Sequence, residues 1–297
     1  MMLTRWTKPL DHPGTIAAER RTSVATSSTS RPVTLPAGSR LVNAMAAELE
    51  ALGASSGQVE LLDGSLSRIS YCVPALCHDG SAAVSFSSTH EAVTPARLIA
   101  GAATVGFRHG ERFAHCHAVW FDAEGDVRGG HLWPETTIGP GPVHAIVHAF
   151  DEVEMISAAD PETRMPVFTP HRRPVDPVDQ HGAVRAVMSR LAPGVLVDTA
   201  VRDIMREHGF DRASIAGSIG SLVGAVLHRG GSVLVVDGPA TEVALTGEFD
   251  LRDPDNPVSR ISGLVIDRFG TVHAGDFVNA ENMVAVTVEL LVEKVTR

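Results

Sequence analysis

The chain has 297 residues, enough for two domains of ordinary size or for one large domain. It is 44% hydrophobic and 20% charged, which is typical of a soluble globular protein, and the absence of any apolar run of eighteen or more residues excludes a membrane-spanning helix. Its 25 Lys and Arg against 35 Asp and Glu give a net charge of −10, and such a surface repels nucleic acid. We therefore expect neither a membrane nor a nucleic-acid partner.

The N-terminal residues 1–33 are rich in Ser, Thr and Arg, and they lack the apolar stretch of a secretory signal. We expect an arm without a core of its own. Three cysteines, Cys72, Cys77 and Cys116, are too few for a disulfide framework. They indicate free thiols in a reducing, cytoplasmic environment.

The first periodic segment follows the arm. Leu41, Met45 and Leu49 recur at a spacing of four, which places them on one face of a helix that Gly53 ends. An apolar strand over 59–66 comes next.

The same pattern recurs further along the chain. Gly209 follows Gly53 by 156 positions, and Gly220 follows Gly64 by the same number. The segments 121–127 and 266–272 also match, at an offset of 145, so the first copy holds 11 additional residues between the two anchors. A repeat at a fixed offset indicates duplication of one structural unit. We predict two tandem copies of one α+β domain, at 34–170 and 190–297, joined by a proline-rich linker over 171–189.

Residues 113–132 predict a β-hairpin, because turn-forming Asp and Gly residues stand between two apolar-rich arms. His115 and His117 are two positions apart on one arm, so they project from the same face. If Phe121 pairs with Val127, then His117 pairs with His131, and three imidazoles converge. A shift of the register by one residue would turn His131 to the other face.

Three histidines with an open fourth position are typical of a catalytic zinc site. We therefore predict a divalent transition metal, zinc in the first place, at His115, His117 and His131. Glu135 is the candidate general base, and Arg112 the candidate clamp for an anionic substrate. The alternative is that the histidines are ordinary strand residues and Glu135 an exposed carboxylate at the end of a strand.

The second copy lacks this triad. At the offset of 145, the three histidines correspond to Arg260, Ser262 and Asp276, which cannot bind a metal in the same way. We expect the metal to be held by the first copy alone. The second copy then serves as a scaffold, or its Arg260 and Asp276 reach a neighbouring site.

These residues resemble the PPC (plant and prokaryote conserved) domain family, whose bacterial members are often named as DNA-binding proteins. The resemblance covers most of 34–170 and, more weakly, 190–297. It rests on these segments: Gly64-Ser65-Leu66-Ser67-Arg68, His115-Cys116-His117, 122–125, Gly129-Gly130-His131-Leu132 and 160–163.

The resemblance implies an antiparallel sheet packed by one main helix, assembly into trimers, and a metal-site role for His115, His117 and His131. It also implies that plant members contact DNA through a separate AT-hook with an R-G-R-P core. That core is missing from this sequence.

Three functions are compatible with these features. The first is a metal-dependent hydrolase or lyase that acts on a small anionic metabolite. The second is a DNA-associated or regulatory protein, as the family's bacterial names suggest. The third is a module that binds a metal or small ligand without turnover.

Overall fold

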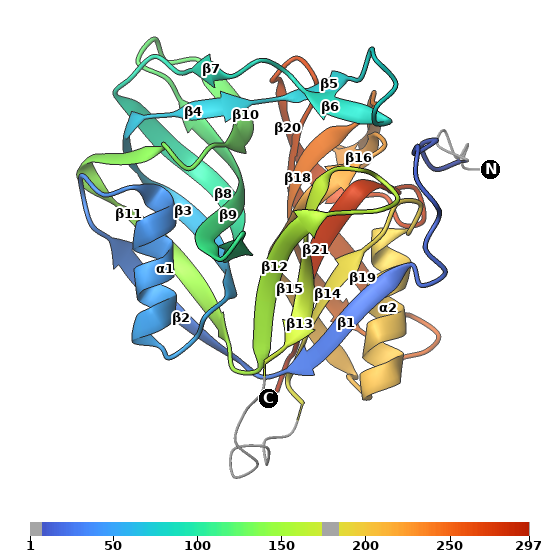
Figure 1. Cartoon of the computed structure of the whole chain (residues 1–297). Coiled ribbons are helices and arrows are strands. Elements are labelled where there is room, and N and C mark those ends of the chain that lie inside the picture. Colours follow the sequence, from blue (N-terminus) through green and yellow to red (C-terminus); the bar gives the residue numbers. More distant parts are fainter. Residues whose placement is uncertain (1–7, 174–183, 297) are drawn as a thin grey trace.

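A computed structural model of the chain describes residues 8–173 and 184–296. It consists of two units, each with a large, mostly antiparallel sheet and one helix on the outer face of that sheet (Figure 1). The inner faces of the two sheets lie against each other. The α+β class and the arrangement of one helix on each sheet are as the sequence predicts.

The first unit runs from residue 28 to residue 150 and is followed by a hairpin that contacts both units. Its elements are β2 (Ser28–Leu35), α1 (Leu41–Ala51), β3 (Gly57–Arg68), β4 (Ser70–Cys72), β5 (Pro74–Leu76), β6 (Val84–Phe86), β7 (His90–Glu91), β8 (Ala96–Arg108), β9 (Glu111–Phe121), β10 (Val127–Leu132) and β11 (Thr137–Phe150). The hairpin consists of β12 (Val153–Ala159) and β13 (Pro166–Arg172), and β12 pairs in parallel with the end of β8.

The second unit is shorter. Its elements are β14 (Ala186–Leu191), α2 (Val197–His208), β15 (Arg212–Leu222), β16 (Ala225–Arg229), β17 (Ser232–Val236), β18 (Thr241–Asp250), β19 (Val258–Ile266), β20 (Val272–Phe277) and β21 (Val284–Lys294).

The strand orders show the duplication. The first sheet runs β2-β11-β3-β8-β9-β10-β4-β7, and the second runs β1-β14-β21-β15-β18-β19-β20-β16-β17. Each strand of the series β2, β11, β3, β8, β9, β10, β4 therefore has a counterpart at the same place in the second sheet. The 11 additional residues of the first copy lie between β4 and β8, where 73–95 replaces 229–240 and forms β5, β6 and β7.

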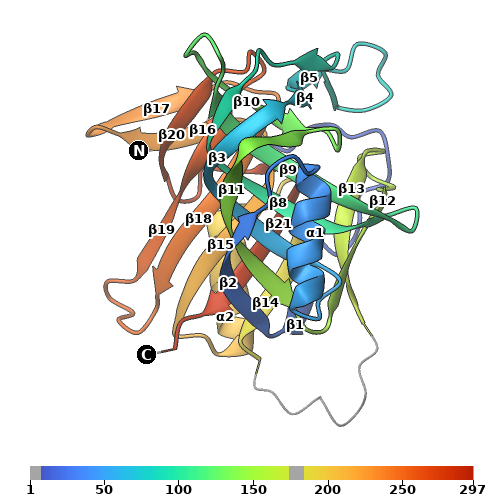
Figure 2. The same ribbon diagram turned by 90° about the vertical axis from the view of Figure 1, so that its left-hand side faces the viewer.

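The helices bury the faces that the sequence predicts. Leu41, Met45 and Leu49 of α1 are buried, as are Val197 and Met205 of α2. Burial of a side chain of this size contributes roughly 1.5–3 kcal/mol, so these faces hold each helix on its sheet. Figure 2 shows α1 lying across the outer face of the first sheet. No helix among residues 8–173 and 184–296 is long and apolar enough to cross a bilayer.

The N-terminal arm differs from the expectation. Strand β2 begins at Ser28, inside the segment expected to lack a core, and it pairs with β11. A further strand, β1 (Arg21–Thr26), pairs with β14 of the second unit. Both are polar edge strands, and the side chains of β2 are largely exposed, so neither shows the apolar alternation that predicts a strand. Most of the predicted linker, 174–183, lies outside the described residues.

Each unit has its own core, and a third cluster joins the two. Phe150, Met155 and Phe168 from the first unit and its hairpin pack with Met188 and Leu291 of the second unit. The two units therefore share buried apolar surface, which fixes the inner faces of the sheets against each other.

Candidate metal centre between the two units

The hairpin of β9 and β10 has the predicted register. Phe121 pairs with Val127, and His117 pairs with His131. Asp122 stabilises the turn, because its Oδ1 accepts hydrogen bonds from the backbone N–H groups of Glu124 (3.0 Å) and Asp126 (2.9 Å). This local turn chemistry sets which residues lie opposite each other.

The three histidines converge on the inner face of the first sheet. Their ring centroids are 4.7 Å apart for His115 and His117, 5.1 Å for His115 and His131, and 5.3 Å for His117 and His131. Their nitrogen atoms lie within 4.8 Å of one another, and His117 and His131 are buried. These three side chains are thus close enough to share one ion.

The second unit fixes the orientation of two of these rings. His115 Nδ1 hydrogen-bonds to the Glu289 carboxylate of β21, and His117 Nδ1 donates to the Val243 carbonyl of β18 at 3.1 Å. Such partners on the far nitrogen select the tautomer and leave Nε2 free as a ligand. The two Nε2 atoms lie 3.1 Å apart.

Glu289 is itself held in place. It is fully buried, and its carboxylate accepts hydrogen bonds from Thr104 (3.4 Å) and Thr287 (3.3 Å) in addition to His115. A buried carboxylate with several donors is well suited to orient an imidazole. Glu289 stands alone as an acidic residue in the apolar run 284–292, and a lone charge in a buried strand was the one signal in the sequence that could have indicated it.

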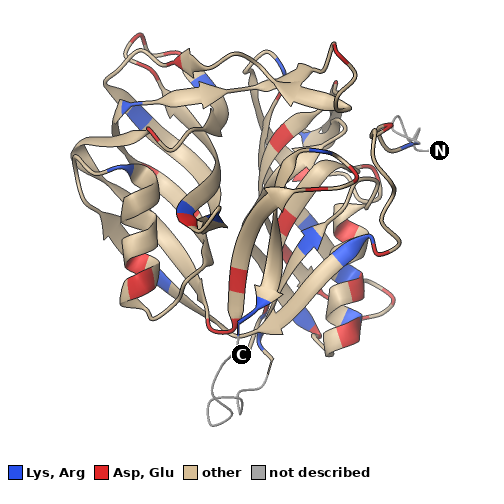
Figure 3. Ribbon diagram, viewed as in Figure 1, with Lys and Arg blue, Asp and Glu red and all other residues tan. Residues whose placement is uncertain are grey.

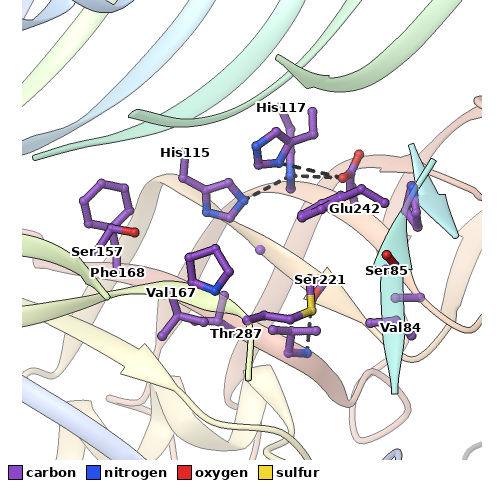
Figure 4. A pocket seen from close by; sticks show the side chains of 18 of the residues that line it. Val84, Ser85, His115, His117, Ser157, Val167, Phe168, Ser221, Glu242 and Thr287 are labelled. Atoms are coloured by element: carbon purple, nitrogen blue, oxygen red, sulfur yellow. Dashed lines mark hydrogen bonds and ion pairs between the residues drawn. The ribbon is translucent and has the colours of Figure 1, made fainter. Parts of the chain in front are cut away.

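Glu242 of β18 is the second carboxylate at the site. Its Oε1 lies 3.7 Å from His117 Nε2 and 3.9 Å from His131 Nδ1. Both oxygens of Glu242 and Nδ1 of His131 are buried without a hydrogen-bond partner. Burial raises the pKa of the Glu242 carboxyl well above its ordinary value. Figure 4 shows Glu242, His117 and His115 directed toward one another.

The site opens on a cavity of about 310 Å³ between the units. The residues that line it belong to β8, β9, the end of β10, the β12–β13 hairpin, the inserted segment 73–95 and the second unit. The lining includes Phe86, Phe113, Trp133, Phe168, Ser221 and Thr287 beside the three histidines and Glu242. A cavity of this size accommodates a small organic molecule.

Two predicted site residues lie elsewhere. Glu135 is exposed in the turn after β10 and does not line the cavity, because the strand ends at Leu132 and its alternation is lost before Glu135. Arg112 is directed toward α1, where it pairs with Glu50 and stacks on Phe107 at 4.3 Å, so it cannot clamp a ligand in the cavity. The structure therefore brings neither Glu135 nor Arg112 to the three histidines.

The second copy has a different part in the site from the one expected. Ser262 pairs with Asp276 at the register that corresponds to His117 and His131. Ser262 and Asp276 hydrogen-bond to each other, and Arg260 pairs with Glu248 at 3.0 Å; none of the three lines the cavity. The second unit instead supplies Glu242, Glu289 and the Val243 carbonyl from strands β18 and β21.

All three cysteines are free. Cys116 belongs to the core under α1, on the face opposite the histidines, and burial raises the pKa of its thiol to about 12. Cys72 lies opposite His131 in the β4–β10 pair and is also buried. The expectation of free thiols is therefore confirmed.

Comparison with known families identifies the repeated unit. Residues 178–296 match the family model described as Plants and Prokaryotes Conserved (PCC) domain. The second half of the chain is thus similar to the PCC domain, and the first unit has the corresponding strand order. The sequence resemblance to this family is confirmed, although the matching segment is the second copy and not the first, which carries most of the quoted motifs. None of the curated proteins compared with the chain matches it.

Solved structures similar to the chain cover about half of it. One, from Ralstonia eutropha, is described as "Putative DNA-binding protein" (15% identity, 46% of this chain and 88% of that chain, TM-score 0.38). Another is a metal-containing protein from Archaeoglobus fulgidus (16% identity, 49% and 96% coverage, TM-score 0.38). A third is a plant- and prokaryote-conserved protein from Pyrococcus horikoshii (13% identity, 52% and 99% coverage, TM-score 0.36).

Proposed function

We propose that the chain holds one divalent transition metal, zinc in the first place, at His115, His117 and His131, and that it uses this metal as a hydrolase or lyase on a small anionic molecule. The observation that supports the metal best is the pair of facing Nε2 atoms. Both Nδ1 atoms have acceptors, so both Nε2 atoms of neutral rings present lone pairs at 3.1 Å. Two lone pairs at this distance repel unless a cation lies between them.

A metal ion suits this position better than a proton. Burial is the main reason that the pKa of His117 is lowered well below its ordinary value, and the same holds for His131. Nitrogen ligands of one tetrahedral zinc at about 2.05 Å are roughly 3.3 Å apart, close to the observed separation. The unpartnered oxygens of Glu242 place a carboxylate on the same side, where its negative charge would balance that of the ion.

The donor set defines the chemistry. Three imidazoles would hold the ion and leave its fourth position open, Glu242 would place a negative charge beside it, and Glu289 and the Val243 carbonyl keep His115 and His117 turned toward it. A zinc ion in such surroundings supplies Lewis acidity toward a carbonyl and lowers the pKa of a bound water. The cavity leaves the donor set accessible to a small molecule, which favours catalysis over a closed structural site.

Two alternatives carry different expectations. A DNA-associated protein would bind duplex DNA most strongly at low salt, since phosphate contacts dominate such binding. The net charge of −10 and the interspersed acidic and basic residues in Figure 3 count against this function. A binding module without turnover would take up the metal and a ligand but convert none of the metabolites in a screen.

The metal is tested by elemental analysis of the purified full chain. We expect about one transition metal ion per chain. The metal content should fall at least tenfold in His131→Ala. It should be unchanged in Asp276→Ala, which alters the corresponding position of the second copy. A chain that takes up no metal even on reconstitution, or a His131→Ala variant that retains it, would contradict the proposal. A low-salt DNA shift assay and a metabolite screen on the metal-loaded protein then separate the three functions.

A further inference from the structure

The cavity beside the metal centre has mostly apolar walls and an uneven distribution of charge. Its acidic and imidazole groups, Glu242 and the three histidines, cluster together. Its other charged lining residues are two arginines, Arg108 at the end of β8 and Arg164 in the turn before β13. The rest of the lining is dominated by aromatic and aliphatic side chains.

Arg108 has no carboxylate partner among the described residues. Its guanidinium lies over the Phe113 ring, 5.2 Å from the centroid, and Phe113 in turn contacts Phe168 at a centroid distance of 5.9 Å. Arg164 is exposed, and its Nη2 makes one long hydrogen bond of 3.5 Å, to the Pro13 carbonyl. An arginine that stacks on an aromatic ring in an apolar cavity keeps its N–H donors free for an anion.

Phe113 of β9 lies between Arg108 and the metal centre. Phe113 and His115 are two positions apart on β9 and so share a face, with roughly 7 Å between their Cα atoms. Together with the stacking of Arg108 beyond Phe113, this places the guanidinium on the order of 10 Å from the imidazoles. In Figure 4, Phe168 lies on the side of His115 away from Glu242, in agreement with this order.

We propose that the cavity binds an elongated carboxylate with an apolar body. The carboxylate pairs with Arg108, the aromatic or aliphatic body packs against Phe113 and Phe168, and the other end of the molecule reaches the histidines. Arg164 is exposed, so Arg108 is the guanidinium set in the apolar wall. One such group suits a monoanion, because a phosphate dianion would need more donors to offset its desolvation. The contact between the other end of the ligand and the histidines rests on the proposed metal function. Binding of the carboxylate by Arg108 does not depend on that function.

The experiment compares acids with their neutral amides. The probes are 3-phenylpropionate and hexanoate against 3-phenylpropionamide and hexanamide, measured by calorimetry on the metal-loaded full chain. We expect each acid to bind at least tenfold more tightly than its amide, and this preference to disappear in Arg108→Gln. Arg97→Gln is the matched control, since Arg97 is an exposed arginine of the same strand that does not line the cavity.

Binding measurements on metal-stripped protein distinguish whether Arg108 or the metal recognises the carboxylate. If Arg108 recognises it, the preference for the acid persists without metal and is lost only in Arg108→Gln. A preference that disappears with the metal and survives in Arg108→Gln would overturn the inference, as would an absence of binding by both acids at millimolar concentration. Elemental analysis of the same samples reports the metal independently, so a chain without metal would contradict the proposed function while leaving the Arg108 result intact.

Discussion

Glu242 is a buried acidic residue that contributes little to folding in the absence of a cation. Both of its oxygens lack a hydrogen-bond partner, and the nearest nitrogens, on His117 and His131, are 3.7 and 3.9 Å away. A buried carboxylate without partners destabilises a fold, and proteins retain such groups mainly where function requires them. The metal ion that we propose for this site would account for the cost of burying Glu242.

Replacement of Glu242 by Gln should thus raise the stability of the metal-free protein and weaken its metal binding. We expect metal-free Glu242→Gln to be about 1–3 kcal/mol more stable than the metal-free wild type, because the neutral amide costs less to bury. We expect its metal affinity to fall by at least tenfold, since a negative charge beside the ion is lost. Denaturant unfolding with and without zinc measures both effects. Equal stability of the two metal-free proteins together with equal metal affinity would contradict this role.

At the scale of elements, His148 connects the two sheets. This histidine of β11 is buried; its Nε2 lies 2.8 Å from Glu60 of β3, and its Nδ1 lies 3.4 Å from Glu293 of β21 in the second unit. Burial alone would lower the pKa of His148, but its hydrogen bonds and charge interactions with Glu293 and Glu60 outweigh that effect and raise the pKa to about 9. His148 is therefore protonated at neutral pH and holds the sheets together as an ion triad.

This raised pKa predicts how stability depends on pH. A group whose pKa is higher in the folded state stabilises the fold fully below its unfolded value near 6.5, and the contribution is lost as the pH rises through about 9. The shift corresponds to roughly 3 kcal/mol. We expect His148→Ala to lose about that much stability at pH 6 and much less at pH 10. His144→Ala, an exposed histidine of the same strand, is the control and should change little at either pH.

The elements also show how far the sequence alone determines the site. The register of the β9–β10 hairpin follows from local turn chemistry at Asp122, so the convergence of His115, His117 and His131 could be predicted. Glu242 and Glu289 are more than 100 positions away along the chain, and only the packing of the two sheets brings them to the histidines. Glu135 was misplaced because strand alternation does not continue through the turn at Pro134.

At the scale of the whole molecule, the two units use different parts of their inner sheet faces to contact each other. The first unit presents its three histidines, and the second presents Glu242 and Glu289. The counterparts of these carboxylates in the first unit, at the offset of 145, are Arg97 and His144, and both are exposed. Arg260 and Asp276, the counterparts of His115 and His131 in the second unit, are exposed as well. Each unit therefore keeps one face of the repeated interface unused within the chain.

These exposed surfaces, which have no partner surface within the described part of the chain, predict association between separate chains. An asymmetric contact repeated from one copy to the next generates a closed ring when the rotation permits it, and the resemblance to the PPC family implies threefold assembly. We expect light scattering at micromolar concentration to give the mass of three chains, and the double variant Arg260→Glu, Asp276→Arg to lower that mass. Glu124→Lys, at the tip of the β9–β10 turn, is the control and should leave the mass unchanged. A monomeric wild-type chain at this concentration would refute the assembly, because the exposed faces would then have no partner.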